Sequence, residues 1–366
     1  MRILEDENKI PIALFDNNME LIKPVYQYVN HIKLKEKEPN TLVAQMSDLK
    51  LFWEFLSYKG LNFIDLTPVM VDDFIVYLKE PYHRPNMSYI NAESIRKAKT
   101  INRILSTIYQ FYTYWEKIIN ANNPILMEES VSPFSMFKSM LDHAKKSGKT
   151  VRSMFKVSEE TEPFRIINEM ESELFMNALP SRRDKLLFKV LYYSGIRISE
   201  ALSLTIEMIP LPDNSNRVGS FQIFEVDKFD LDRQLKTGPR TVYMPMSVLT
   251  ELDKFIMEER TRIDTEHSYI FVSNQKRFLG KPLTRSNVEQ LFTRISKKTG
   301  NNINPHDLRH TCCTNLIQGG MDTSVAQKIM GHKHISTTQK YTHLSDVFVE
   351  RKLDEYWKAT NILGGV

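Results

Sequence analysis

The sequence of 366 residues has only two cysteines and no long apolar run, and both scarcities restrict what the protein can be. Cys312 and Cys313 are neighbours in a segment of helix-forming composition, so their Cα atoms are closer together than a relaxed disulfide requires. We therefore expect two small buried side chains, no disulfide scaffold and a reducing compartment. A membrane-spanning helix needs a run of about 18 apolar residues. Since the sequence has none, we expect no membrane span.

Further absences narrow the chemistry. The first residues, MRILEDENKIPIALFDNN, carry acids where a signal peptide needs an apolar run, so we expect a cytoplasmic protein. No glycine-rich phosphate loop occurs, which argues against nucleotide hydrolysis. His306 and His310 have the spacing of a zinc pair, but the glutamate of an H-E-x-x-H site is missing and no third ligand is evident. We expect no metal and no other cofactor.

The composition is that of a globular protein, with 42% hydrophobic and 26% charged residues. Its length favours about two domains. The formal net charge of +4 permits nucleic-acid binding but does not argue for it, because many mildly basic proteins bind none. The distribution of charge along the chain therefore matters more than the total.

Apolar residues recur at helical spacing over residues 42–56, 67–80 and 92–119. The third of these predicted helices has a core stripe, formed by Ile101, Leu105, Ile108, Phe111, Tyr112 and Trp115. We expect an all-helical domain over residues 21–120, preceded by an N-terminal extension of residues 1–20.

The third predicted helix also carries a polar stripe, Arg96, Lys99, Arg103, Thr107 and Gln110, at steps of three or four residues. Such a stripe is often a solvated helix face. It also suits a helix laid along phosphates, because Arg and Lys neutralise charge while Thr and Gln add hydrogen bonds. The pattern alone leaves both interpretations open.

Residues 121–162 have polar ends with prolines and one short amphipathic piece, so we expect an inter-domain linker. After it, residues 221–246 change to the period of strands. The runs FQIFEV and RTVYMPM flank DKFDLDRQLKTGP, which predicts a small antiparallel hairpin or three-strand sheet. YIFVS, residues 269–273, predicts one more short strand. The second domain, residues 163–344, is thus expected to be mainly α with a small β element.

The segment 304–344, NPHDLRHTCCTNLIQGGMDTSVAQKIMGHKHISTTQKYTHL, gathers the residues that carry chemistry. His306 and Arg309 are three apart and share one face of a helix that opens after a proline. A glycine ends the next helix, so His332 lies just past a helix terminus. Tyr341 follows on the last predicted helix. We expect short helices that end at glycines to bring these side chains together.

These residue types suit phosphoryl transfer from a phosphodiester. Arginine matches the fork of two phosphate oxygens and stays charged. A tyrosine hydroxyl, with a pKa near 10, is a weak nucleophile until a base or a cationic field favours its phenolate. Positioned cations then offset the charge of the transition state without a metal. A thiol nucleophile at Cys312 is the alternative, but nothing in the sequence marks that thiol as activated.

The motifs HDLRH and GHKHISTTQKYTH resemble the C-terminal signature of the tyrosine recombinase (phage integrase) family. The family's box of glycine, arginine and glutamate is matched by SGIRISEALSL, and its hairpin lysine by LKTGPRTVYMP. The pattern TLVAQMSDLKLFWEFL with TINRILSTIYQFYTYW is similar to the family's helical core-binding domain. The motifs occur in the family's order over most of residues 40–348.

The resemblance implies a catalytic site of six side chains, Arg197, Lys236, His306, Arg309, His332 and Tyr341. The tyrosine attacks the scissile phosphate and forms a 3′-phosphotyrosyl bond, while the two arginines hold the non-bridging oxygens. The lysine protonates the leaving 5′ oxygen. The two histidines hydrogen-bond the phosphate or assist proton movement to and from the tyrosine. Glu200 is expected to hold an arginine or a histidine rather than act as a base.

The implied protein is a site-specific DNA recombinase of a bacterial mobile element, an integrase or transposase that needs neither metal nor ATP. The implied partner is double-stranded DNA at specific sites, bound by a homo-tetramer and held in a clamp of the two domains. The resemblance leaves room for helper proteins, and for a tail, residues 345–366, that docks on a neighbouring subunit. It also favours a DNA-facing role for Arg96, Lys99, Arg103 and Thr107.

Some alternatives stay open. A type IB topoisomerase shares the tyrosine chemistry but relaxes DNA as a monomer, and a non-catalytic relative would only bind DNA. The gap between Arg197 and Lys236 contains an apparent insertion, PLPDNSNRVGS, so Lys228 competes for the role of the hairpin lysine. His334 stands near His332 and competes with it in the same way.

Overall fold

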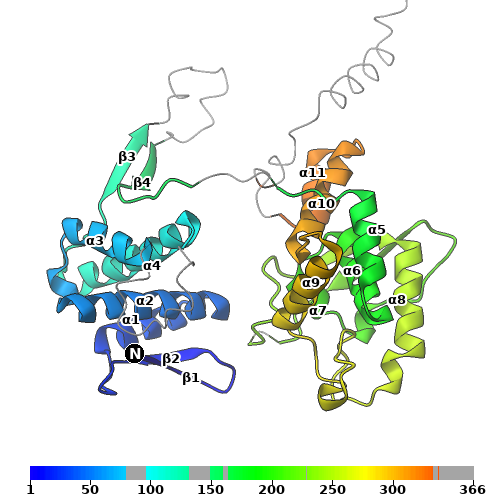
Figure 1. Cartoon of the computed structure of the whole chain (residues 1–366), viewed down its shortest axis with the longest axis horizontal. Coiled ribbons are helices and arrows are strands. Elements are labelled where there is room, and N and C mark those ends of the chain that lie inside the picture. The colour runs from blue at the N-terminus through cyan, green and yellow to red at the C-terminus, as the bar shows by residue number, and fades with distance from the viewer. Residues whose placement is uncertain (80–95, 132–148, 160–163, 228, 333–336, 338–366) are drawn as a thin grey trace, which may run out of the picture. The chain divides into compact units, whose positions relative to one another are not determined.

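The computed structural model describes residues 1–79, 96–131, 149–159, 164–227, 229–332 and 337. The chain divides into two compact units, Met1–Glu162 and Pro163–Val366 (Figure 1). Both are mainly helical and carry small antiparallel strand pairs, so the predicted fold class is confirmed. No helix within the described ranges combines the length and apolar character that crossing a bilayer requires.

In its described residues up to Ile119, the N-terminal unit begins with an antiparallel pair of strands and continues with four α-helices and one 3-10 turn. These elements are β1 (Arg2–Glu5), β2 (Pro11–Phe15), α1 (Lys23–Leu34), α2 (Pro39–Lys59), η1 (Phe63–Asp65), α3 (Pro68–Lys79) and α4 (Ala98–Ile119). Ile10 and Leu14 of the first hairpin are buried in the same core as the helices. Residues 1–20, expected as an extension, are therefore built into this unit.

Helix α4 contributes its predicted stripe to the core, because all six of its apolar positions are buried. The helix begins at Ala98 rather than at residue 92, and Arg96 precedes it. Lys97 occupies the N-cap position with an extended backbone. The described part of the predicted polar stripe therefore starts outside the helix.

A second strand pair, β3 (Met127–Val131) and β4 (Lys149–Ser153), occupies part of the segment expected to be a linker. The chain on either side of this pair packs back on the N-terminal unit. Ile125 is buried in its core, and Asn102 on α4 holds the backbone of Val157 through two hydrogen bonds of 2.9 Å. The amphipathic piece expected at 134–144 lies outside the described residues.

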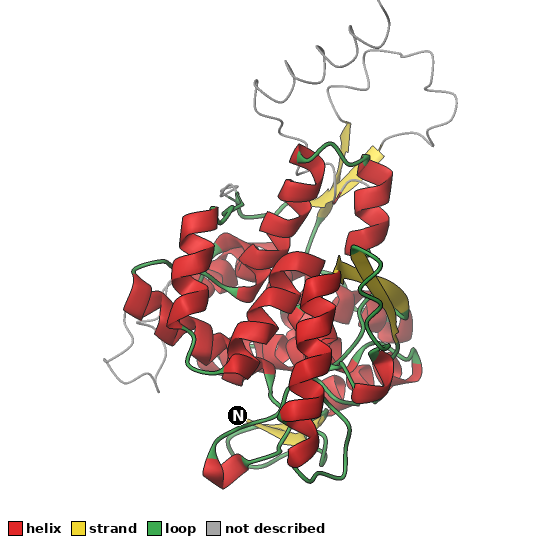
Figure 2. Ribbon diagram, turned by 90° about the vertical axis from the view of Figure 1, so that its right-hand side faces the viewer, coloured by secondary structure: helices red, strands yellow, loops and turns green. Residues whose placement is uncertain are grey.

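The C-terminal unit is built around α6, which packs against α8, α10 and β6 (Figure 1). Helices, drawn in red in Figure 2, make up most of the described chain. Its elements are α5 (Glu169–Ala178), α6 (Arg182–Ser194), α7 (Ile198–Leu202), η6 (Ile206–Met208), β5 (Val218–Ile223), β6 (Arg240–Pro245), α8 (Met246–Glu258), η7 (Arg260–Arg262), η8 (Lys276–Phe278), α9 (Arg285–Thr299), α10 (Pro305–Gln318) and α11 (Thr323–Met330).

The predicted hairpin of this unit is confirmed, because β5 and β6 pair antiparallel from Val218 opposite Pro245 to Ile223 opposite Arg240. The strand predicted at residues 269–273 is wrong. Tyr269 and Val272 make only isolated bridges, to Thr205 and Pro282, because the neighbouring segments are turns that leave no longer edge to pair with.

Candidate active site

The turn between α6 and α7 places Arg197. Gly195 ends α6 in a left-handed conformation with φ of 61°, and a Cβ there would lie 2.8 Å from the Cε atom of Met330. Only glycine therefore fits this turn. Arg197 follows as the N-cap of α7, and its backbone N–H donates to Oε2 of Glu200 at 2.8 Å. Its Nη1 donates to Oε1 of the same carboxylate at 3.0 Å.

Glu200 is fully buried and is held by a second arginine, Arg240 at the start of β6. The Arg240 Nη2 donates to Oε2 at 2.9 Å. Burial by itself would raise the pKa of Glu200, but Arg240 and then Arg197 outweigh it, and the pKa lies below its ordinary value. The carboxylate is therefore ionised at neutral pH and fixes two arginines, as expected of an anchor rather than a base.

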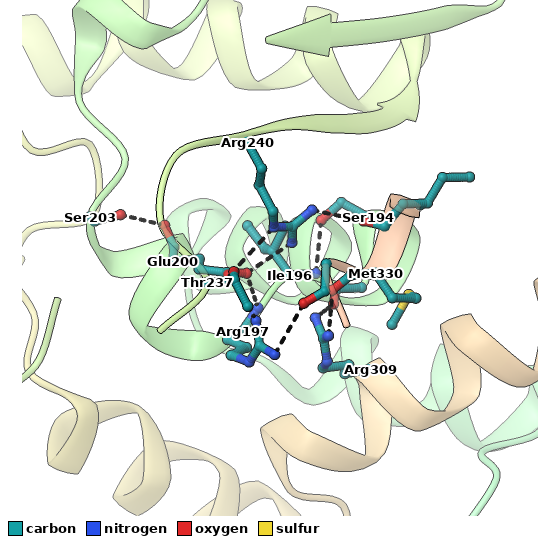
Figure 3. A network of polar contacts seen from close by, with 12 residues as sticks. Ser194, Ile196, Arg197, Glu200, Ser203, Thr237, Arg240, Arg309 and Met330 are labelled. Atoms are coloured by element: carbon teal, nitrogen blue, oxygen red, sulfur yellow. Dashed lines mark hydrogen bonds and ion pairs between the residues drawn. The ribbon is translucent and has the colours of Figure 1, made fainter. Parts of the chain in front are cut away.

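Arg309 reaches the same place from α10. A capping box starts this helix, in which the Asn304 side chain accepts from the backbone of Asp307 and the Asp307 carboxylate accepts in return. The Arg309 side chain is buried and donates from Nη1 to the carbonyl of Gly195 and from Nη2 to the carbonyl of Met330. Figure 3 shows the guanidinium groups of Arg197, Arg240 and Arg309 gathered beside Met330.

His332 lies just past Gly331, which ends α11 with φ of 63°. Gln327 holds it, because the backbone N–H of His332 donates to the Gln327 carbonyl and the Gln327 amide donates back to the His332 carbonyl at 3.0 Å. Burial, and then Arg309 and its neighbouring arginines, lower the pKa of His332 to about 4. The ring is therefore neutral near pH 7 and can either donate or accept a hydrogen bond.

His306 and His310 form a ring pair on α10, with centroids 4.3 Å apart. Partial burial, and then Arg309, lower the pKa of His306, although its side chain keeps an exposed face. His310 is buried and stacks on Phe164 at 4.3 Å, and burial lowers its pKa to about 4. His306 is thus the ring of this pair that can reach a substrate, while His310 packs behind it.

Lys236 is exposed in a turn that leads into β6. Gly238, with φ of 71°, closes the turn by donating to the carbonyl of Leu235. The hydroxyl of Thr237, next to the lysine, lies 3.4 Å from Nη1 of Arg197 and 3.3 Å from Oε1 of Glu200. The turn that carries Lys236 therefore contacts both Arg197 and the Glu200 carboxylate that holds it.

The two cysteines are buried free thiols, as predicted. Burial raises the pKa of Cys312 to about 12 and that of Cys313 to about 11. Both thiols stay protonated at neutral pH, which argues against a thiol nucleophile. Among the described residues, no group of three or more His, Cys, Asp or Glu side chains is arranged to hold a metal ion.

Residues 164–347 match the phage integrase family, and residues 25–117 match the N-terminal SAM-like domain of phage integrases. The chain belongs to the phage integrase family. Transposase A from transposon Tn554 of Staphylococcus aureus is 29% identical over 356 residues, 96% of this chain and 96% of the transposase. The tyrosine recombinase XerC of Lacticaseibacillus casei is 25% identical over 344 residues, 93% of this chain and 100% of the recombinase.

Two solved structures of integrases have a similar fold. The Tn1549 transposon integrase in complex with transposon right end DNA has a TM-score of 0.58 at 18% identity and covers 90% of this chain and 98% of its own. A lambda integrase dimer bound to a COC′ core site has a TM-score of 0.56 at 15% identity and covers 88% and 97%. At such identities the likeness concerns the fold.

In this member of the integrase family, five of the six predicted catalytic residues lie within the described residues. Arg197, Arg309 and His332 come together at the end of α11, while Lys236 and His306 lie on the adjoining turn and helix. The predicted nucleophile Tyr341 and the competing residues Lys228 and His334 lie outside the described residues, as does the tail 345–366.

Arg240 and Gln327 were missed by the sequence-based prediction. Arg240 stands inside the motif LKTGPRTVYMP, but its partners Glu200 and Ile329 are far away along the chain. The local pattern therefore gave no sign of them. Gln327 looks like any polar residue on an amphipathic helix. Only the folded chain shows that its amide holds the backbone of His332.

The residues predicted to face DNA in this integrase are not equivalent. Lys99 is exposed on α4, and Arg96 donates to the carbonyl of Leu78 at 3.3 Å. The Arg103 side chain is 49% exposed and pairs with Asp48 of α2 at 2.6 Å. Thr107 differs from the expectation of a phosphate contact. It is 4% exposed, and its hydroxyl donates to the buried Asp48 carboxylate at 2.8 Å, because α2 packs over that part of the helix.

Proposed function

We propose that the protein is a site-specific DNA recombinase of the integrase and transposase type, which breaks and rejoins strands through Tyr341. The observation that carries the proposal is the convergence of Arg197 and Arg309 on neighbouring carbonyls, those of Gly331 and Met330. Two guanidinium groups placed together in this way suit the two non-bridging oxygens of one phosphodiester. Family membership and the relatedness to Transposase A over 96% of this chain favour a mobile-element recombinase.

In the proposed reaction, the Tyr341 oxygen attacks phosphorus and forms the P–O bond of a 3′-phosphotyrosine, while the bond from phosphorus to the 5′ oxygen breaks. The tyrosine proton passes to a neutral histidine, His306 or His332, or to water. Lys236 gives a proton to the leaving 5′ oxygen. Because one phosphodiester replaces another, the step needs no ATP, and Arg197 and Arg309 stabilise the charge of the transition state.

The proposed substrate is double-stranded DNA, and the exposed cations Lys99 and Arg103 on α4 are the contacts proposed for the N-terminal unit. The exposed face of α9 adds Arg294 and Lys297 in the C-terminal unit. Such cations neutralise phosphates without reading sequence. A homo-tetramer on two duplexes, with the tail 345–366 docked on a neighbour and helper proteins at the target, extends the proposal.

The test is a library of nicked duplexes of random sequence, incubated with the purified protein in EDTA. Adducts that survive SDS are isolated and the attached DNA is sequenced. Tyr341→Phe is run beside the matched control Tyr193→Phe, which changes a half-exposed tyrosine of the same unit. We expect adducts that require Tyr341 and converge on one sequence.

Other outcomes of this test discriminate between the alternatives. Adducts that need Tyr341 but show no sequence preference would favour a type IB topoisomerase. Adducts that persist in Tyr341→Phe would contradict the tyrosine mechanism. Binding to DNA with no adduct from any substrate would favour a non-catalytic relative.

A further inference from the structure

The C-terminal end of α11 holds three arginines on three consecutive carbonyls. Arg240 donates to the carbonyl of Ile329 at 2.7 Å, Arg309 to that of Met330, and Arg197 to that of Gly331 at 3.5 Å. Carbonyls at a helix end lack partners within the helix and carry partial negative charge, so they attract cations. The three arginines come from β6, α10 and the start of α7, and all three donate to carbonyls at the end of α11 (Figure 3).

Arg240 is not one of the two arginines proposed to hold phosphate, but its hydrogen bonds, like theirs, join two parts of the protein. It donates from Nη2 to Glu200 and from Nη1 to Ile329, and its side chain is only 10% exposed. The backbone of Gly331 lies flat against it, since a Cβ at Gly331 would stand 2.8 Å from the Arg240 Nε and Cδ atoms. This guanidinium is thus enclosed by protein.

The position of Arg240 in the chain gives these contacts a consequence. It lies four residues after Lys236, at the first position of β6, while Ile329 lies three residues before His332. Glu200 also holds Arg197 at 3.0 Å. One continuous set of contacts therefore links three parts: the turn that carries Lys236, the Glu200 carboxylate that holds Arg197, and the end of α11, after which the chain continues to Tyr341.

We infer that Arg240 is a positioning residue for strand cleavage, which locks the end of α11 to the Glu200 carboxylate. Arg197 and Arg309, the turn that carries Lys236, and His332 then take their places together. The inference rests on the proposed function. It requires a planar cation with donors on two sides, so a lysine at this position can hold the carboxylate but not both partners at once.

The experiment measures DNA affinity and the single-turnover rate of adduct formation separately, on a nicked duplex carrying the recognised site. The variants are Arg240→Gln, Arg240→Lys and Arg240→Ala. Arg182→Gln is the matched control, since Arg182 also pairs with carboxylates, Glu258 and Glu259, but on the surface of the same unit. Thermal unfolding of each variant shows which of them fold.

We expect Arg240→Gln to bind DNA within about threefold of the wild type, since the side chain is enclosed by protein. Its cleavage rate should fall about 100-fold, the cost of misplacing a reacting group by about 1 Å. Arg240→Lys should lose about tenfold, and Arg182→Gln should cleave like the wild type. Added guanidinium should restore cleavage to Arg240→Ala, whereas the same concentration of sodium chloride should not.

The pH profile gives a readout that a purely structural role would not move. After burial, the pKa of His332 is lowered by Arg309, Arg197 and Arg240 in that order, and then by His310. Removing Arg240 takes away one of these cations, so the pKa of His332 rises. The acid limb of the cleavage profile should therefore move to higher pH in Arg240→Gln and stay in place in Arg182→Gln.

A folded Arg240→Gln that cleaves at the wild-type rate with an unmoved acid limb would overturn the inference. If that variant does not fold, Arg240→Lys decides, and full activity of the lysine variant would overturn the inference equally. A wild-type protein that forms no Tyr341-dependent adduct would instead overturn the proposed function, so the two failures are distinguishable.

Discussion

At the scale of single residues, Thr107 and Arg103 share a carboxylate but face different surroundings. The Thr107 hydroxyl is buried and donates to the Asp48 carboxylate, whereas the Arg103 side chain pairs with the same carboxylate and is half exposed. Burial raises the pKa of Asp48, while its hydrogen bonds to Thr107 and Arg103 act in the opposite direction. Thr107 should therefore contribute to stability alone, whereas Arg103 contributes to stability through Asp48 and is exposed enough to contact DNA as well.

We predict that Thr107→Val lowers the free energy of unfolding by about 1 kcal/mol, because the Asp48 carboxylate loses a buried donor. Its affinity for DNA should not change. Arg103→Gln should weaken DNA binding and reduce the slope of log Kd against log salt by about one unit. Urea unfolding and salt titrations of binding measure the two effects. An unchanged salt slope for Arg103→Gln would show that Arg103 does not contact DNA phosphates.

A second prediction concerns the buried anion Glu200. Glu200→Gln leaves two arginines facing an uncharged amide, and the cost of breaking such a buried pair is about 3 kcal/mol at pH 7. The folded pKa of Glu200 is lowered, so the charge stabilises the fold above the unfolded pKa of about 4.3 and this contribution is lost as pH falls through the folded pKa. Urea unfolding from pH 7 down to pH 3 should show the gap between wild type and variant closing only in acid.

At the scale of helices and strands, the glycines that end α9 and α11 make a matched pair. Gly300 has φ of 73° with open space around its Cα, and Gly331 has φ of 63° with Arg240 against it. Alanine at either site costs about 1–2 kcal/mol of stability through the left-handed backbone. Only Gly331→Ala displaces the arginine. We therefore predict a larger loss in thermal stability for Gly331→Ala than for Gly300→Ala, because the displaced arginine also leaves the buried Glu200 carboxylate. Adduct formation should be lost in Gly331→Ala alone, and equal activity of the two variants would contradict this.

Periodicity predicted α2, α3 and α4 and the β5–β6 hairpin because each pattern is local. The core stripe of α4 repeats at three and four residues, and the strand runs flank a turn closed by Gly238. The same reasoning placed Thr107 on the polar face, because spacing along one helix does not reveal that α2 packs over it. The pair β1–β2 was missed for a related reason, since Ile10 and Leu14 are buried only against distant helices.

The residues of the candidate site were predicted in part, because motif spacing identifies only residues that belong to a known motif. The resemblance named Arg197 and Arg309, and the structure places both on the end of α11. It did not name Arg240, whose partners lie about 40 and 90 residues away in the chain, as their hydrogen bonds span these separations. Contacts over such distances arise only from the fold. The role of Tyr341 stays a prediction.

At the scale of the whole molecule, each of the two units has a core of its own. The buried cluster of the N-terminal unit runs from Ile10 to Ile125, and Phe155 and Val157 pack against it from the far side of β4. The large cluster of the C-terminal unit runs from Ile167 to Leu308. Neither cluster includes a described residue of the other unit. Each unit is therefore expected to fold alone, as separate cores allow.

This separation gives a last prediction, on how the covalent link contributes to DNA binding. Residues 1–162 and residues 163–366, produced as two proteins, should each unfold cooperatively in a thermal melt. Each should bind the recognised duplex more weakly than the whole chain by about 10²–10⁴-fold, because linkage makes the second contact intramolecular at a millimolar effective concentration. Mixing the two proteins at micromolar concentration should recover little of the loss. A C-terminal piece that binds as tightly as the whole chain would instead mean that the N-terminal unit contributes nothing to DNA binding.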